Sequence, residues 1–257
     1  MALYEKISAY YDELFPLKES RVAFITSFLN KENQSILDVG CATGELSLCL
    51  AMKGHHIVGI DLDFDTLEIA RGKRVKGPGL ALFLVKDMTH IGQEFLPGSF
   101  GAVLCFGNTL VHLENPAAIT DFFIGVANGL KKDGTFMVQV VNYDRILAGK
   151  VKELPVIERE NLLFQRDYSY DAEAHRIQFR GRLTIKETET VPGSTETVAG
   201  STETVLESTE SLYPLTYAEL KTALDHAGFS DLEFFGNEEK APYDIDSPAL
   251  IAVARKR

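Results

Sequence analysis

The chain of 257 residues carries a formal net charge of −11, and its 45% hydrophobic and 25% charged residues are typical of a globular protein. An acidic chain repels phosphate backbones, which argues against nucleic acid as a partner. No apolar run reaches about 18 residues and the N-terminus lacks a secretory pattern, so we expect no membrane span and a cytoplasmic location.

The first half of the chain alternates between two hydrophobic periods. Helical spacing predicts helices over 18–29, 45–54, 64–72 and 116–130, and apolar runs predict strands over 35–40, 56–63, 80–88, 101–108 and 135–142. Asp63 and Asn115 stand at helix-capping positions, and Asp133 with Gly134 predicts a turn before the last strand. Strands alternating with helices predict a doubly wound, mostly parallel Rossmann-like α/β sheet with helices on both faces.

The second half begins with a different pattern. Residues 162–171 and 176–191 alternate side-chain type with period two, which predicts antiparallel strands in an insertion before the last helix. A helix returns over 216–228, where Thr216 and Glu219 form a capping box, and strands at 231–237 and 249–255 complete the sheet. We expect three parts: an N-terminal helical lid segment (1–30), a Rossmann-like domain (31–142 and 214–257) and an antiparallel β insertion (143–213).

An internal repeat with a period of seven residues runs from Gly193 to Tyr213 as GSTETVA, GSTETVL and ESTESLY. This period is typical of coiled coils, but Thr and Val dominate the units and no apolar seam is present. We expect a lengthened hairpin that is mobile at its tip and has no chemical role.

The stretch ILDVGCATGELSL, Ile36 to Leu48, places a glycine-bracketed loop between a strand and a helix. Such loops occur in both dinucleotide-binding and S-adenosylmethionine-binding folds. Glu45 in the first helical turn would compete with a phosphate for the helix dipole, and Asp38 adds a second negative charge. Both charges suit a cation, which favours S-adenosylmethionine, with its sulfonium and ammonium, over the NAD alternative.

The loop sequence D-V-G-C-A-T-G, Asp38 to Gly44, resembles the first motif of class I S-adenosylmethionine-dependent methyltransferases, with Ala42 replacing the middle glycine. The stretches LCFGNTLVHL (104–113), VVNYDRIL (140–147) and SLYP (211–214) are similar to the glycine N-methyltransferase and small-amine N-methyltransferase branch. Members of that branch also carry a β insertion before the last helix. The resemblance implies an enzyme that binds S-adenosyl-L-methionine and releases S-adenosyl-L-homocysteine.

Cofactor contacts are expected at the ends of successive strands. Asp61 would accept hydrogen bonds from the ribose hydroxyls, and the resemblance implies that Asp87 takes the adenine amino group. It also assigns the backbone of Met88 to the ring and that of Phe106 to the border of the cofactor. The other expected contacts are Asp38, Gly40, Ala42 and Gly44 in the loop, Leu62 beside Asp61, Tyr11 in the lid, and Arg21, which would reach the cofactor carboxylate.

The methyl acceptor is expected on the side of the insertion, positioned by Asn108, Tyr143 and Tyr213. Val141 stands where glycine-specific relatives have an Arg, which argues against glycine unless an insertion arginine replaces it: Arg166, Arg180 or Arg182. We expect His112 to be a packed, hydrogen-bonded histidine rather than a base.

Methyl transfer from a sulfonium depends mainly on in-line alignment and exclusion of water. The sequence contains no evident base or metal-ligand set for an oxygen acceptor, so the predicted substrate is a small molecule with an amine nitrogen. A small-metabolite O-methyltransferase and a regulatory module without turnover remain alternatives, and the sequence leaves a homo-oligomer open. The three cysteines, Cys41, Cys49 and Cys105, are expected to be reduced core thiols.

Overall fold

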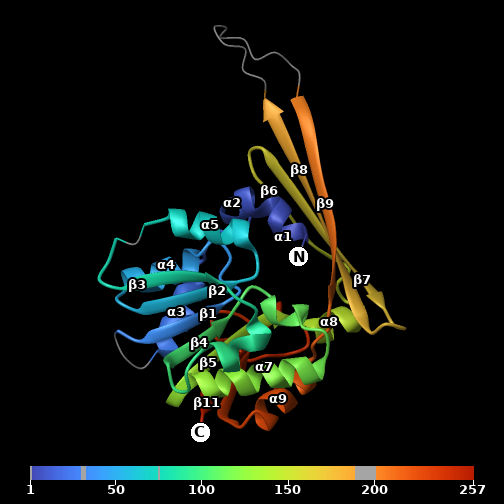
Figure 1. The fold of residues 1–257 in the computed structure, drawn as a ribbon. Helices are drawn as coiled ribbons and strands as arrows, with labels where there is room; N and C mark the ends of the chain where they lie inside the picture. The colour runs from blue at the N-terminus through green and yellow to red at the C-terminus, as the bar shows by residue number, and fades with distance from the viewer. Residues whose placement is uncertain (1, 30–32, 75, 189–200) are drawn as a thin grey trace.

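The computed structural model describes residues 2–29, 33–74, 76–188 and 201–257 (Figure 1). Its larger sheet has the order β10-β11-β5-β4-β1-β2-β3. The strands are β1 (Ser35–Val39), β2 (His56–Asp61), β3 (Leu80–Val85), β4 (Phe100–Cys105), β5 (Leu130–Val141), β10 (Phe229–Phe235) and β11 (Ala249–Lys256). The pairs among β1 to β5 are parallel, whereas β11 is antiparallel to β5 and β10. The predicted doubly wound, mostly parallel sheet is confirmed.

Helices cover both faces of this sheet, as its alternating side chains require. On one face, Ile36 and Leu104 pack with Phe24 and Leu50 of the helices α3 (Glu19–Phe28) and α4 (Glu45–Met52). The opposite face packs against α7 (Pro116–Gly129) and α9 (Tyr217–His226). The remaining helices are α5 (Phe64–Gly72), the short α1 (Ala2–Ile7), α2 (Tyr11–Leu14), α6 (Ile91–Glu94) and α8 (Tyr143–Leu147), and the 3-10 turns η1 (Ser8–Tyr10), η2 (Met88–His90) and η3 (Thr109–His112).

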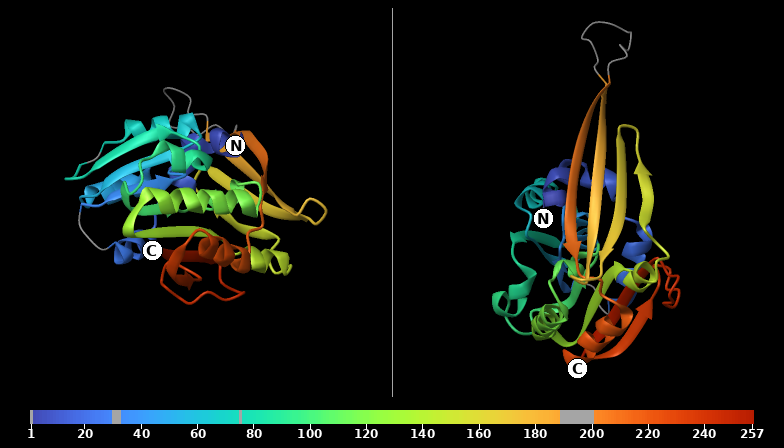
Figure 2. Two further views of the ribbon diagram at one scale, coloured as in Figure 1. Left: turned by 60° about the horizontal axis from the view of Figure 1, so that its bottom comes forward. Right: turned by 90° about the vertical axis from the view of Figure 1, so that its right-hand side faces the viewer.

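The insertion forms a second, antiparallel sheet with the order β6-β7-β8-β9. Its strands are β6 (Glu153–Glu158), β7 (Leu162–Asp171), β8 (Arg176–Thr188) and β9 (Ser201–Leu212). The long ribbon of β8 and β9 projects away from the larger sheet (Figure 2). Near the body of the molecule, Phe164, Ile177 and Leu212 join the same hydrophobic core as α7 and α9, so the insertion is anchored at one end.

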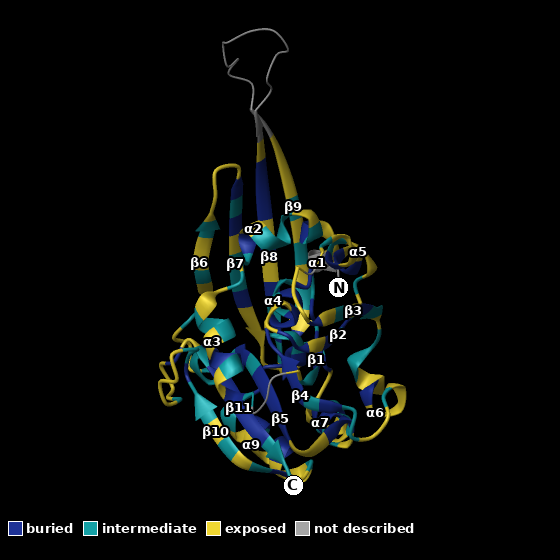
Figure 3. Cartoon of the chain, turned by 90° about the vertical axis from the view of Figure 1, so that its left-hand side faces the viewer, coloured by how far each residue is buried: buried dark blue, intermediate teal, exposed yellow. Residues whose placement is uncertain are grey.

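The seven-residue repeat does not become a structural repeat. The second and third units lie mostly in β9, as the hairpin prediction required, while 193–199 and the expected mobile tip fall outside the described residues. Successive strand residues point to opposite faces, so positions seven apart differ in environment. Val205 is 41% exposed, whereas Leu212, its counterpart in the next unit, is 1% exposed. Exposed residues dominate the outer part of β9 (Figure 3).

Local signals define the starts of α5, α7 and α9. Asp63 accepts a hydrogen bond from the Thr66 N–H (2.9 Å), Asn115 caps α7, and Thr216 with Glu219 forms the expected capping box. The turn predicted at Asp133 and Gly134 lies instead inside β5, where the pairing with β4 shifts register. A strand can absorb such a bulge and continue, which the local turn signal does not reveal.

The N-terminal segment lies between α5 and the ribbon (Figure 1). Lys6 donates to the Glu207 carbonyl on β9 (2.8 Å), and Asp12 pairs with Lys73 (2.6 Å) after α5. Asp12 also accepts from the hydroxyl of Thr43, in the glycine loop. Residues of α2 are thus tied to the loop expected to hold the cofactor. Within the described residues, no helix combines the length and apolar character needed to span a membrane.

Candidate functional site

A cavity of about 490 Å³ lies at the carboxyl ends of β1, β2 and β4. The chain order reverses between β1 and β4, and such a point in an α/β sheet is where ligands bind. The volume lies within the usual range of small-molecule sites, about 300 to 1,000 Å³. Its described lining includes Tyr11, Gly40, Ala42, Asp61, Leu62, Asp87, Met88 and Phe106, which are eight of the predicted cofactor residues.

The glycine loop approaches its neighbours too closely for ordinary side chains. Gly40 has a positive φ of 70°, and a Cβ atom there would lie 2.3 Å from the hydroxyl oxygen of Thr109. Ala42 also has a positive φ, 46°, although it carries a side chain. Its backbone N–H donates to Asp61 (2.9 Å), so the loop is bound directly to the end of β2.

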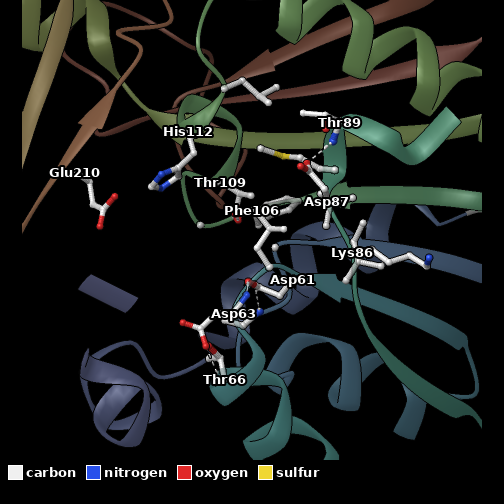
Figure 4. Close-up of a pocket in the computed structure, with 18 of the residues that line it drawn as sticks. Asp61, Asp63, Thr66, Lys86, Asp87, Thr89, Phe106, Thr109, His112 and Glu210 are labelled. Atoms are coloured by element: carbon white, nitrogen blue, oxygen red, sulfur yellow. Dashed lines mark hydrogen bonds between the residues drawn. The ribbon is translucent and has the colours of Figure 1, made fainter. Parts of the chain in front are cut away.

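Asp61 is held by two backbone donors, the N–H groups of Ala42 and Asp63 (2.9 and 3.0 Å), one on each carboxylate oxygen. Burial raises the pKa of its carboxyl, and these hydrogen bonds oppose that rise. Each oxygen can accept a second hydrogen bond, and the side chain faces the cavity (Figure 4). This geometry suits a ligand with two adjacent hydroxyl groups.

A second group of lining residues comes from the ends of β3 and β4. Asp87 accepts from the Thr89 N–H (2.8 Å), which starts the turn η2 and places Met88 at the wall, and Phe106 is 5% exposed. On the β2 side, Thr66 lines the cavity, and its buried hydroxyl has no hydrogen-bond partner in the described structure.

Two predicted loop residues lie behind the cavity wall. Asp38 is 3% exposed and accepts from the Ser47 hydroxyl (2.6 Å), and burial raises its pKa to about 6. Gly44 faces β3, where a Cβ atom would lie 2.6 Å from the ring of Phe83. The sequence analysis expected the negative charge of Glu45 to act on a cationic ligand. In the structure this carboxylate pairs with Lys73 (2.5 Å) and does not face the cavity.

Arg21 and Tyr11 come from the N-terminal segment. Arg21 donates from Nε to Glu238 (2.7 Å) and lies 5.8 Å from the centre of the Phe106 ring, so it borders a lining residue without lining the cavity itself. Tyr11 lines the cavity, and burial together with Asp61 raises its pKa to about 12. Its hydroxyl is therefore neutral at physiological pH.

The three residues predicted to position the acceptor are engaged elsewhere in this structure. Asn108 donates to the Tyr143 hydroxyl (3.0 Å) and accepts from the Val141 N–H (2.9 Å), and Tyr143 is fully buried. Tyr213 donates to Glu219 (2.5 Å). None of the three belongs to the described cavity lining, and their acceptor role stays a prediction.

The insertion arginines are also placed away from the cavity. Arg180 pairs with Asp167 (3.1 Å), Arg182 pairs with Glu207 (3.3 Å), and Arg166 donates to the Pro155 carbonyl (2.8 Å). Among the described lining residues none is an arginine, so the structure does not supply the replacement that a carboxylated acceptor would need.

One end of the cavity carries His112, which the sequence analysis expected to be a packed histidine rather than a base, and Glu210, which it did not single out. His112, at the end of η3, and Glu210, on β9, lie together opposite the end with Lys86 and Asp87 (Figure 4). Glu210 belongs to the third repeat unit, for which the sequence analysis expected no chemical role. Its place in the cavity lining does not support that expectation. The sequence carries no local signal for this pair, because it is formed only when β9 returns to η3.

The residues present fit S-adenosylmethionine. At Gly40 the backbone approaches its neighbours closely, and Asp61, anchored on both oxygens, is an acceptor for hydroxyl groups. The described lining holds five carboxylates and one cation, Lys86, which is itself paired with Glu94. Such an acidic wall suits a cationic ligand and disfavours a pyrophosphate.

Comparison with known proteins agrees with this geometry. Residues 36–134 match the family model described as a methyltransferase domain. A putative methyltransferase of Bacillus subtilis, YqeM, is 32% identical over 140 residues, which are 54% of this chain and 55% of that protein. A ubiquinone biosynthesis O-methyltransferase of Hydrogenovibrio crunogenus is 45% identical over 138 residues, 52% of this chain and 54% of that protein. The chain spans about half the length of these curated relatives.

Solved structures match over a longer part of the chain. An S-adenosylmethionine-dependent methyltransferase from Clostridium acetobutylicum has a TM-score of 0.78 at 14% identity, and the match covers 98% of both chains. S-adenosylmethionine-bound CalS10, an amino pentose methyltransferase from Micromonospora echinaspora, has a TM-score of 0.66 at 17% identity and covers 100% of this chain and 98% of its own. The chain therefore has the fold of these S-adenosylmethionine-dependent methyltransferases over nearly its whole length, and residues 36–134 match the methyltransferase domain model.

Proposed function

We propose that the chain is an S-adenosylmethionine-dependent methyltransferase that methylates an amine nitrogen of a small molecule. The observation that carries the proposal is the acidic cavity at the strand ends, with Asp61 fixed by the N–H of Ala42 in the glycine loop. The methyltransferase domain in residues 36–134 and the fold shared with S-adenosylmethionine-bound CalS10 support the same cofactor.

Bound there, S-adenosylmethionine would supply an electrophilic methyl group, and the chain would bind, orient and shield it. In this proposal Asp61 accepts from the ribose hydroxyls and Asp87 from the adenine amino group. Arg21 reaches the carboxylate, since its Nε alone contacts Glu238 and the rest of the guanidinium can bind a further acceptor. Tyr11 and Phe106 close the wall and exclude water.

The amine assignment rests on charge. Amines are protonated near neutral pH, and the carboxylates at the wall attract such a cation. CalS10, an amino pentose methyltransferase whose match covers 100% of this chain with a TM-score of 0.66, supports an amine acceptor.

A small-metabolite O-methyltransferase is the second candidate, favoured by one observation. An oxygen acceptor needs a base, and His112 at the cavity wall is a residue that can act as one. The relative from Hydrogenovibrio crunogenus, a ubiquinone biosynthesis O-methyltransferase, points the same way for the sequence-matched half of the chain.

The test begins with ligand binding. S-adenosylhomocysteine is expected to raise the melting temperature and NADH to leave it unchanged, and the reverse result would support a dinucleotide site instead. Asp61→Asn is expected to raise the Kd of S-adenosylhomocysteine about 10-fold, because a charge-assisted contact is lost. Asp65→Asn, an exposed change on α5 outside the cavity lining, is the matched control.

Activity is then measured as S-adenosylhomocysteine release with pooled small amines and, separately, pooled small alcohols. Release with amines supports the proposal, and release only with alcohols replaces it by the O-methyltransferase. Binding without release in either pool would favour a regulatory module without turnover.

A further inference from the structure

We propose that Glu210 receives the ammonium group of the acceptor and that His112 takes the proton which this nitrogen loses before methylation. The inference rests on the proposed amine methyltransferase function and names the acceptor class: a primary or secondary amine without a neighbouring carboxylate. Neither residue belongs to the set that the sequence predicted for the acceptor.

Distant parts of the chain build this end of the cavity. The Tyr213 N–H donates to the Val111 carbonyl (2.8 Å), which joins the end of β9 to η3. Glu210 precedes this bond on β9 and His112 follows it on η3, so the two side chains come to the same wall (Figure 4). This backbone link brings the two residues to the same end of the cavity.

Arg176 of β8 holds the same corner from behind. Its guanidinium donates to the carbonyl of Ser211 (2.6 Å), to the hydroxyl of Ser211 (3.0 Å) and to the carbonyl of Glu114 (2.9 Å). It thereby bridges the residues that follow Glu210 and His112. A planar fork bound to three acceptors favours one orientation of the guanidinium.

The charges at this end select a cation. Glu210 lies at this end, Asp63 lies along the same wall, and the lining cation Lys86 is at the opposite end. Glu114, two residues after His112, also belongs to the cavity lining. The Arg176 guanidinium behind this corner is engaged by Ser211 and by the Glu114 carbonyl. An acceptor carboxylate would meet these acids without an arginine partner from the described lining. An ammonium group would instead donate a charge-assisted hydrogen bond to the half-buried carboxylate of Glu210.

His112 is suited to take a proton. Burial lowers its pKa from 6.5, the nearby charge of Arg176 lowers it further, and Glu210 opposes both. The imidazole is therefore neutral at pH 7, and a neutral imidazole has one ring nitrogen that can accept a proton. When it becomes an imidazolium, the Glu210 carboxylate stabilises the new charge.

The ammonium gives one proton to His112 and becomes a neutral amine with a free electron pair. That pair forms the new N–C bond to the transferred methyl group, and the electrons of the broken C–S bond remain on sulfur, which leaves S-adenosylhomocysteine. His112 then returns its proton to solvent.

The chain offers a matched control for Glu210. Glu203 occupies the same position in the preceding repeat unit, is exposed on the same strand and is outside the described lining of the cavity. Glu203→Gln and Glu210→Gln therefore make the same chemical change seven residues apart.

The experiment measures methyl transfer to three pools: amines without a carboxylate, the corresponding amino acids, and the corresponding alcohols. For the amines, Glu210→Gln is expected to raise KM about 10- to 100-fold, and Glu203→Gln is expected to leave it unchanged. His112→Asn is expected to lower kcat about 100-fold or more and to remove the rise of kcat with pH that lies below pH 6.5 in the wild type. Binding of S-adenosylhomocysteine to each variant shows that the fold and cofactor site are intact.

A second readout does not need turnover. The titration of His112, followed by NMR in the presence of S-adenosylhomocysteine, is expected to move to lower pH in Glu210→Gln and to stay in place in Glu203→Gln. Unchanged KM and an unchanged His112 titration in Glu210→Gln overturn the inference while amine methylation stands. Transfer only to amino acids overturns the inference while the amine assignment stands. Transfer only to alcohols, or to none of the pools while S-adenosylhomocysteine binds, overturns the inference together with the amine assignment.

Discussion

Replacing Asp38 by Asn should stabilise the ligand-free protein, and only at neutral pH. The carboxyl is 3% exposed, and its pKa is raised from 3.8 to about 6, chiefly by burial. A group whose pKa is raised on folding contributes stability that is complete below pH 3.8 and is lost as the pH rises through about 6. At about 1.4 kcal/mol per pKa unit, the charged form lowers the free energy of unfolding by about 3 kcal/mol at pH 7.5.

Asn has the same shape as Asp, keeps an oxygen that can accept from the Ser47 hydroxyl, and carries no charge. The Asp38→Asn variant is therefore expected to exceed the wild type by about 1 to 3 kcal/mol at pH 7.5 and to differ little at pH 4. The lower bound allows for burying the new NH₂ group. Urea unfolding at 25 °C and both pH values measures the difference.

Asp65→Asn, exposed on α5, is the control and should show no such pH-dependent gain. A variant no more stable than the wild type at pH 7.5 would refute the reasoning, because it would mean that the buried carboxylate is not destabilising. An equal gain at both pH values would also refute it, since the effect would then come from shape rather than charge.

Three further outcomes are expected. Lys73→Met should speed amide hydrogen exchange in residues 8–14, because Asp12 loses its 2.6 Å ion pair; unchanged exchange would mean that the other contacts of the segment suffice. Gly40→Ala should lower the free energy of unfolding by about 2 kcal/mol or more, because the new methyl group would clash with Thr109 and the residue would keep a positive φ. Adding Thr109→Gly should recover part of this loss, and no recovery would exclude the steric clash. Thr216→Ala should cost about 1 kcal/mol in urea unfolding through the lost cap of α9, and a loss near zero would show that the helix is held by packing alone.

The part of the fold that follows from local chemistry could be predicted from the sequence. The strand and helix periods, and the caps at Asp63, Asn115 and Thr216, need only neighbouring residues. The helix α8 could not be predicted in this way. Its cap, Asn142, is fixed by donating to the carbonyls of Asp244, Ile245 and Ser247, which are about a hundred residues away in the sequence.

The candidate site also contains residues that the sequence could predict and residues that it could not. Residues at strand ends, such as Asp61 and Asp87, were predictable because the topology of a parallel sheet brings those ends to one edge. The ion pair of Glu45 with Lys73 was not predictable, because the two residues meet only through the packing of α5 beside the glycine loop. His112 and Glu210 meet through tertiary pairing between η3 and β9, which no local pattern encodes.

The ribbon of β8 and β9 has a consequence for how this family of chains can vary. It is anchored at its base, where Leu212 is buried and Tyr213 is bound to Val111, and this base carries Glu210. A duplication or loss of one seven-residue unit toward the far end would leave that base in register with β8. Divided between two strands, each unit would change the reach of the ribbon by about 11 Å. A change in the number of repeat units would therefore alter the length of the ribbon without altering the residues at its base.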